Sequence, residues 1–314
     1  MSVFLFEYAT CGAFAELEPS ITVEGMGMFK TLESGFEDVS TFIDSRISDF
    51  DNFPRVKNYE ELFFDYSEKS DFFLVIAPES AGVLHNLTVE AEKSGNVNLG
   101  STPGAIEIAA DKLATYEALH GLQTPKTELY DSSTSLNFPL IAKPRDGVSC
   151  EGVALLRNED ELKNVPEGYL LQEYVKGTPA SATLLVGDEV QILSLNTQEI
   201  EDFKYTGAKI PLETDAETEE IIKAAERIKG LHGLVGIDFI LNDRVNIIEI
   251  NPRPTTPIIA LNDVYGFNIS KLVLDNYYHE RIPNFEAKKS VTLKKGSKKQ
   301  NSFVSFGDYS IWIQ

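Results

Sequence analysis

One stretch of this chain, Gly236–Pro257, constrains its fold more than any other. It reads GIDFILNDRVNIIEINPRPTTP, and two runs rich in branched apolar residues flank the short polar turn at 242–244. So brief a turn between two such runs predicts a β-hairpin. Strand pairing then brings Asp238, near one end of the hairpin, close to Glu249 and Asn251, which share one face of the second strand.

These three side chains indicate a metal site. Two carboxylates and an amide carbonyl are hard oxygen ligands, which suit Mg²⁺ (or Mn²⁺) better than Zn²⁺. The alternative is a strand with one solvated polar face. It fits poorly, because the neighbours of Glu249 are isoleucines.

Length and composition bound the class of protein. The 314 residues suffice for two or three packed units, and a hydrophobic content of 42% is ordinary for a globular protein. No apolar run approaches the roughly 20 residues of a membrane span, and the N-terminus reads as a first strand and not a signal peptide. Cys11 and Cys150 are the only cysteines. They make neither a disulfide framework nor a zinc site, so we expect a cytoplasmic protein.

The net charge of −21 argues against binding to nucleic acid, which depends on basic surface. The excess is concentrated early, because residues 1–100 hold 6 Lys and Arg against 18 Asp and Glu. Any phosphate site must therefore be built from locally gathered cations and metal. The expected partners are small molecules, with no nucleic acid and no membrane. A homodimer is left open.

Strands and helices alternate over residues 1–102. The expected strands are 3–8, 38–43, 72–77 and 96–99, and the expected helices 25–36, 59–68 and 81–94. This alternation predicts a parallel sheet covered on both faces. Glu7 and Glu79 end two of the strands, at the usual ligand edge of such a sheet. The alternative for each is a solvated loop acid.

The next segment offers lysines and glycines. Residues 103–120 have helical spacing throughout, with Lys112 inside the predicted helix and Gly121 at its end. A short strand at 138–144 carries Lys143 and leads into a glycine-bearing loop at 145–152. Such a loop can bring its backbone N–H groups onto phosphates, although it is not a Walker A loop.

Antiparallel strands dominate the remainder, so the architecture is mixed. Strands are expected at 169–175, 182–186, 190–195 and 205–211, helices at 216–229, 258–264 and 269–278, and edge strands within 303–313. The lysine-rich run 288–299 reads as a solvated loop.

In order and spacing, five of these segments resemble the ATP-grasp superfamily. They are Asp111-Lys112, the Lys143-Pro strand with its loop to Gly152, QEYVKG at 172–177, Lys209, and the hairpin that ends in EINPR at Arg253. The resemblance implies an α/β (α+β overall) fold. It comprises a Rossmann-like pre-ATP-grasp domain (1–102), a small lobe (103–176) and a C-terminal lobe with the metal site (177–314), the two β-rich lobes enclosing ATP.

The resemblance also implies roles for single residues. Asp238, Glu249 and Asn251 would hold Mg²⁺. Lys209 would approach the phosphates, and Arg253 would steady the transferred phosphoryl group or a substrate carboxylate. The expected nucleotide contacts are Lys112, Lys143, Asp146, Gly147, Ser149, Gly152, Gln172, Glu173, Tyr174 and Val175. Pro179 stands where many members carry a ribose-binding glutamate, so ribose recognition must differ here.

A narrower resemblance spans nearly the whole chain. The runs FEYA (6–9), APE (77–79), HNLT (85–88), NLGST (98–102) and LSLNTQ (193–198) look like the tyramine–L-glutamate ligase family of methanofuran biosynthesis. The implied reaction joins the γ-carboxylate of glutamate to the amine of tyramine. We expect the acid beside Arg253 and the amine beside Glu7 or Glu79. Alternatives are another acid and amine pair, a carbamoyl-phosphate synthase or carboxylase relative, and a non-catalytic nucleotide-binding protein.

Overall fold

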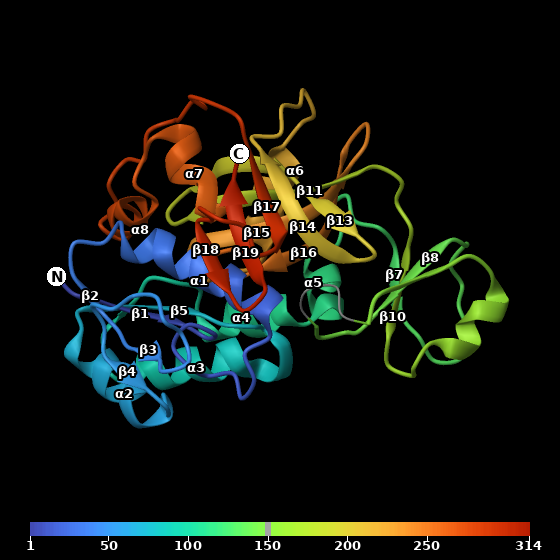
Figure 1. Ribbon diagram of the computed structural model, residues 1–314. Coiled ribbons are helices and arrows are strands. Elements are labelled where there is room, and N and C mark those ends of the chain that lie inside the picture. Colours follow the sequence, from blue (N-terminus) through green and yellow to red (C-terminus); the bar gives the residue numbers. More distant parts are fainter. Residues whose placement is uncertain (148–151) are drawn as a thin grey trace.

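The computed structural model describes residues 1–147 and 152–314. It shows a first α/β part, a small antiparallel sheet that stands apart at the right of the view, and a larger β-rich part (Figure 1). Among the residues described, we find no helix with both the length and the apolar composition that a membrane crossing needs.

The first part is a parallel sheet with helices around it. The strand order is β2 (Val39–Ser40), β1 (Val3–Glu7), β5 (Phe72–Ile76) and β6 (Val97–Asn98). Every residue of β1 and β5 is buried, as in a parallel sheet covered on both faces. The helices are α1 (Pro19–Glu33), α2 (Glu60–Lys69) and α3 (Val83–Glu92). The predicted alternation is confirmed.

The strand expected at 38–43 is in fact two short strands. After Ser40 the chain leaves β1, and β3 (Ile43–Asp44) pairs instead with β4 (Arg55–Val56). The first helix also begins earlier than expected, at Pro19, where the Glu18 side chain accepts a hydrogen bond from the N–H of Ile21.

The small sheet has its own core. Its order is β7 (Thr127–Leu129), β10 (Leu170–Glu173), β8 (Leu140–Lys143) and β9 (Ala154–Leu156), with the 3₁₀ helix η2 (Glu159–Asn164) beside it. All of its strand pairs are antiparallel. The core consists of Leu140, Ala142, Leu156, Leu162 and Leu171. This core is separate from the two larger hydrophobic clusters of the protein.

A four-stranded antiparallel sheet carries the hairpin predicted at 236–257. Its order is β12 (Val190–Thr197), β11 (Thr178–Val186), β15 (Gly233–Leu241) and β16 (Val245–Asn251). The helices α4 (Pro103–Ala110), α5 (Lys112–Ala118) and α6 (Glu219–Arg227) all contact β16. Ala105 and Ala109 of α4 thus belong to the core of this sheet. The domain boundaries proposed at residues 102 and 176 stay a prediction.

A five-stranded sheet in the C-terminal part of the chain packs against helix α1 of the first part. Its order is β13 (Glu199–Glu201), β14 (Lys204–Ile210), β17 (Val291–Ser297), β19 (Tyr309–Ile313) and β18 (Val304–Phe306). Helix α1 contacts β18 and β19, as well as the C-terminal helices α7 (Ile258–Tyr265) and α8 (Ile269–Tyr277). One hydrophobic cluster therefore runs from the first part into this sheet.

Two expectations about local structure were wrong. Residues 103–120 form two helices, because Asp111 adopts an extended conformation and its carboxylate accepts hydrogen bonds from the first turn of α5. The run 288–299 is not a solvated loop. Strand β17 lies within it, with Val291 and Leu293 buried.

Gly25 is the point at which α1 meets the end of β1. A Cβ added there would overlap the carboxylate of Glu7, which is buried and bonded to its own turn. We therefore expect Gly25→Ala to lower the free energy of unfolding by about 1–3 kcal/mol, the usual cost of overpacking. The measurement is urea unfolding.

Gly104 gives the matched control, because a Cβ there meets nothing within 4 Å. Gly104→Ala should be neutral or stabilising by up to about 1 kcal/mol, the helix-propensity difference. Equal stability of the two variants would contradict the packing argument.

Candidate active site

The hairpin β15–β16 places two carboxylates face to face. Asp238 pairs with Glu249 across the strands, and the next pair is Phe239 with Ile247, so Ile248 forms a bulge. The bulge is what lets Ile247 enter the core with Phe239 while Glu249 keeps to the face of Asp238. Residues two apart would otherwise share a face.

Further side chains surround Asp238. Gln198 Nε2 donates to its Oδ1 at 2.9 Å, and Asn251 Nδ2 lies 3.4 Å from its Oδ2. Burial and then the charge of Glu249 raise the pKa of Asp238 well above its ordinary value. Burial acts on Glu249 in the same direction, but the charges of Lys112 and Lys143 outweigh it, and its pKa is lowered. The pair therefore carries one negative charge more readily than two.

This donor set fits a hard divalent cation. Asp238 and Glu249 present carboxylate oxygens, and rotation of its amide group gives Asn251 an oxygen at the same place. A cation would relieve the repulsion that raises the pKa of Asp238. Within residues 1–147 and 152–314, no group of three or more His, Cys, Asp and Glu side chains is arranged to hold a metal. Magnesium sites commonly use only one or two carboxylates.

The Asp111-Lys112 pair ties the glycine loop to this hairpin. Asp111 accepts two hydrogen bonds from Arg145 Nε, at 2.8 and 2.9 Å, and this pairing lowers the pKa of Asp111. Lys112 Nζ donates to the carbonyl of Gly147 at 2.6 Å and lies 3.5 Å from a carboxylate oxygen of Glu249. One ammonium group thus touches both the loop and the carboxylate pair.

Part of that loop lies outside the described residues. Ser149, an expected nucleotide contact, is among residues 148–151. Asp146, at the start of the loop, faces the N–H of Ala81 at 3.5 Å. Gly152 has φ +73°, and a Cβ there would press on Tyr169 and Pro144.

Lys143 and Gln172 lie together inside the small sheet. Lys143 is only 4% exposed, and its Nζ donates to Gln172 Oε1 at 3.1 Å. The Gln172 amide donates in turn to Thr127 Oγ1 at 2.8 Å. The amide of Gln172 is therefore bonded at both its oxygen and its nitrogen, and its oxygen holds the ammonium group of Lys143.

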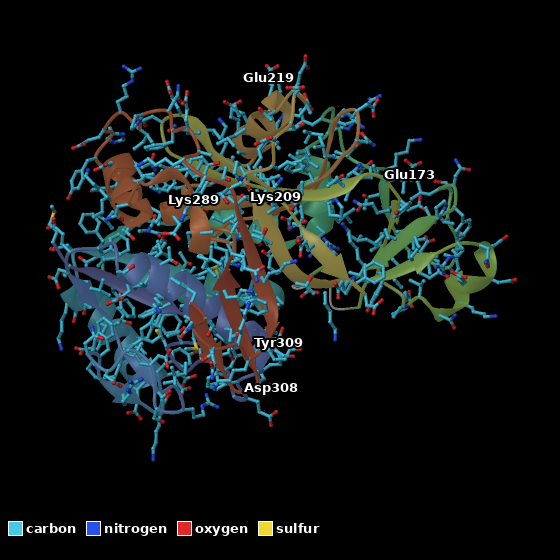
Figure 2. All side chains as sticks on the ribbon, turned by 45° about the horizontal axis from the view of Figure 1, so that its top comes forward. Glu173, Lys209, Glu219, Lys289, Asp308 and Tyr309 are labelled. Carbon is cyan, nitrogen blue, oxygen red and sulfur yellow. The ribbon has the colours of Figure 1, made fainter. Side chains whose placement is uncertain are left out.

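The chain then leaves the sheet through Glu173, Tyr174 and Val175. Glu173 and Tyr174 donate their backbone N–H groups to the carbonyls of Lys126 and Pro139. Tyr174 is 46% exposed. The N–H of Val175 has no hydrogen bond to any described residue, so this donor is open to the edge of a nucleotide base. Figure 2 shows Glu173 on the small sheet.

Lys209 comes from the neighbouring sheet. Strand β14 fixes it, and its backbone N–H donates to Thr197 Oγ1 at 2.8 Å. Its side chain is exposed and, within the described parts of the chain, pairs with no carboxylate (Figure 2). It remains available to an anion.

Arg253 makes an ion pair with Glu79. Its Nη2 donates a hydrogen bond to one carboxylate oxygen at 2.9 Å. Its Nε lies 2.8 Å from the other oxygen, but neither of these two atoms has a hydrogen-bond partner among the described residues. Arg253 lies two residues after Asn251, whereas Glu79 lies three residues after strand β5 of the first part. The ion pair therefore links the first α/β part to the β-rich part at the site.

Glu7 does not face this site freely. Its carboxylate accepts from the N–H groups of Ala9 and Thr10 and from Thr10 Oγ1, and burial raises its pKa. Our expectation that Glu7 binds an amine is therefore not supported. An open pocket of about 430 Å³ does lie beside Glu79. Four of its eight lining residues are acidic and one is an arginine: Glu79, Gly82, His85, Glu107, Ala110, Asp111, Arg145 and Asp146.

Sequence reasoning missed several of these contacts. Gln198 belongs to the LSLNTQ run that carries the narrower resemblance, but nothing in the sequence indicates that its amide bonds the carboxylate of Asp238. Arg145 was predicted only to begin a loop. Lys295, which pairs with Glu24, was hidden in the lysine-rich run, although the alternation of Val291 and Leu293 was a signal for a strand.

Comparisons with known proteins agree with this geometry. The family described as "ATP-grasp domain" matches residues 109–257, and "pre ATP-grasp 3 domain" matches residues 39–106. A tyramine–L-glutamate ligase from Methanocaldococcus fervens is 34% identical over 311 residues, which cover 93% of this chain and 100% of the relative.

Two solved structures are similar in fold. An ATP-grasp superfamily protein from Archaeoglobus fulgidus has a TM-score of 0.85 and 34% identity, covering 100% of this chain and 98% of that one. N5-carboxyaminoimidazole synthetase from Staphylococcus aureus, solved with ADP, has a TM-score of 0.72 at 16% identity, covering 94% and 82%. The fold is thus the ATP-grasp fold with its preceding α/β domain, the class whose members bind ATP with Mg²⁺ or Mn²⁺. Within that superfamily the chain belongs to the family of the tyramine–L-glutamate ligases.

The carboxylate pair leads to a prediction for the metal-free protein. Burial and the charge of Glu249 raise the pKa of Asp238 to about 8, so at neutral pH the folded protein keeps Asp238 protonated, whereas the unfolded chain ionises it. Asp238→Asn is neutral in both states. With chelator present at pH 7, we therefore expect the variant to be about 1–2 kcal/mol more stable than the wild type. Thermal unfolding checks this.

The same experiment with Mg²⁺ or Mn²⁺ added supplies the control. The wild type should gain stability from the cation and the variant should gain little, because a ligand that binds the folded state stabilises it. A variant less stable than the wild type in chelator would contradict the repulsion argument.

Proposed function

We propose that this protein is an ATP-dependent ligase that joins the γ-carboxylate of L-glutamate to the amine of tyramine, releasing ADP and phosphate. The observation that carries the proposal is the apposition of Asp238 and Glu249, with Asn251 beside them and Lys112 and Arg253 at hand. Similarity over the whole length of a tyramine–L-glutamate ligase supports the substrate pair, which belongs to methanofuran biosynthesis.

The metal and the nucleotide have separate sets of residues in this proposal. Asp238, Glu249 and Asn251 hold the divalent cation, which when bound neutralises phosphate charge. Lys112, Lys143 and Lys209 bind phosphate oxygens, and the loop residues Asp146, Gly147, Ser149 and Gly152 cover them. The adenine base of ATP lies against Glu173, Tyr174 and Val175. Gln172 holds Lys143 in place through a hydrogen bond.

Forming an amide from a carboxylate in water requires activation. The γ-carboxylate oxygen of glutamate takes the γ-phosphoryl group of ATP, so that an acyl phosphate forms and ADP leaves. The neutral amine nitrogen then attacks the acyl carbon, the C–O bond to phosphate breaks, and the nitrogen loses a proton to water. The protein contributes positioning, charge neutralisation and exclusion of water, as in other phosphoryl transfers.

Arg253 is the residue proposed to steady the acid. Its Nη2 bonds Glu79 at 2.9 Å and its Nη1 bonds the carbonyl of Pro254 at 3.1 Å, while its buried Nε has no hydrogen-bond partner among the described residues. Arg253 is therefore oriented before any substrate arrives, which lowers the entropy cost of binding. The amine is proposed to enter through the acidic pocket beside Glu79, whose charge favours an ammonium group.

The test of the proposal is an ADP-release assay with single components left out. Purified protein should release ADP and phosphate only when ATP, Mg²⁺, glutamate and tyramine are all present. Replacing tyramine with other amines, and glutamate with other amino acids, locates the specificity. ADP release with bicarbonate and no amine would favour a carboxylase relative instead, and no turnover under any condition would favour a non-catalytic nucleotide-binding protein.

Glu249→Gln tests the metal assignment within that assay. The variant loses one ligand charge, and we expect kcat to fall by roughly 100-fold or more at saturating Mg²⁺ with the fold intact. Glu219→Gln is the control, because Glu219 lies on α6 (Figure 2), is exposed and, within the described residues, pairs with Lys223 alone. Wild-type turnover by Glu249→Gln would refute the assignment.

A further inference from the structure

A second, partly buried ion pair lies near the site and takes no part in the roles given so far. Lys295 Nζ lies 2.5 Å from a carboxylate oxygen of Glu24, and the other oxygen accepts from Thr256 Oγ1 at 2.6 Å. The side chains of Lys295 and Glu24 are only 10% and 20% exposed. Lys295 comes from β17, near the C-terminus, and Glu24 from α1.

The position of Lys295 on its strand is unusual for a lysine. Val291 and Leu293, two and four residues earlier, are buried, and Lys295 shares their face of β17. Its neighbour Lys294 points to the opposite face, where it pairs with Glu199 and both side chains are about a third exposed. A buried ion pair is weak evidence of stabilisation, because desolvation offsets much of the attraction. Stabilisation alone therefore does not account for the pair of Lys295 and Glu24.

The pair is connected to the catalytic region by the segment that follows Asn251. In that segment Arg253 bonds Glu79 and Thr256 bonds Glu24, so two acids of the first part meet one short stretch of the second. Tyr205 lies beside both groups. Its ring centre is 5.8 Å from Lys295 Nζ, and its buried hydroxyl has no hydrogen-bond partner among the described residues.

The charges of this cluster also reach the metal-ligand candidates. Burial, and then the charges of Glu24 and Asp238, raise the pKa of Tyr205. Thr256, which bonds Glu24, follows Arg253 by three residues in one segment. A small molecule that contacts Lys295 and Glu24 at one end would therefore have Arg253 in the direction of its other end. An amino acid with a side-chain carboxylate has this form.

We propose that Lys295 and Glu24 bind the α-carboxylate and the α-ammonium group of the amino-acid substrate, which directs its side-chain carboxylate to the phosphoryl-transfer site. An adjacent cation and anion match the opposite charges that an amino acid carries on one carbon. The ammonium group of Lys295 has three N–H donors, and Glu24 is its one hydrogen-bond partner in the described residues. It can therefore donate to a substrate carboxylate without breaking its bond to Glu24. This inference rests on the proposed function and names the residues that select its acid substrate.

Two substrate analogues separate the roles of the two residues. 4-Aminobutanoate is glutamate without its α-carboxylate, and glutarate is glutamate without its α-ammonium group. The wild type should prefer glutamate to both. Lys295→Met should lose at least about tenfold of the preference over 4-aminobutanoate, and Glu24→Gln at least about tenfold of the preference over glutarate, the scale of one charge-assisted hydrogen bond.

The KM values distinguish this role from a structural one. Lys295→Met should raise the KM for glutamate at least about tenfold while the KM for ATP and for the amine stay within about twofold, because only the acid loses a contact. Lys294→Met is the matched control, since it removes the adjacent lysine and an ion pair on the outer face. It should leave all three KM values unchanged. If Lys295→Met fails to fold, Lys295→Gln and the isosteric Glu24→Gln take its place.

The outcomes are separable from those of the proposed function. Unchanged preferences in variants that still turn over glutamate would overturn this inference and leave the ligase intact. Equal effects of Lys295→Met and Lys294→Met would also overturn it. If the wild type used another amino acid, the same analogues of that acid apply. If it used no amino acid at all, both proposals would fall.

Discussion

The apposition of Asp238 and Glu249 is the constraint on which the rest of the site depends. A hairpin with one bulge forces two carboxylates together, where burial and then the charge of Glu249 raise the pKa of Asp238. Such an arrangement persists only if other groups supply positive charge. Lys112 and Lys143 supply it here, and they come from different parts of the fold. The hairpin therefore draws α5 and the small sheet into one electrostatic unit.

Much of this site could be predicted from the sequence, because its key parts are local. Asp238, Glu249 and Asn251 lie within one hairpin, and the apolar runs that form its strands are visible directly. The alternation of strands and helices before residue 102 is likewise a local pattern. Periodicity alone, however, did not show that Asp111 would end one helix and begin another, since its role depends on hydrogen bonds to the next turn.

The remaining contacts join residues far apart in sequence and leave no local trace. Arg253 was expected to be open to substrate, yet it meets Glu79 across 174 positions. Lys295 was hidden in a run of lysines that composition marks as solvated, yet it meets Glu24 across 271 positions. In each case the tertiary fold determines the partner. Composition indicates the average environment of a residue type, whereas these ion pairs form only because two distant segments pack against each other.

The balance of charge explains why so many of these cations are paired. With a net charge of −21, the protein as a whole repels ATP, and only locally gathered cations can bind it. Yet Lys112 meets Glu249, Arg145 meets Asp111 and Arg253 meets Glu79. Such pairs hold flexible side chains in place before a ligand arrives, and each phosphate must then compete with a carboxylate for its cation. Phosphate binding is strongest where the carboxylate gains another partner. Glu249, the carboxylate that Lys112 contacts, is the one that the donor geometry offers to a divalent ion, so metal and nucleotide should bind this chain cooperatively.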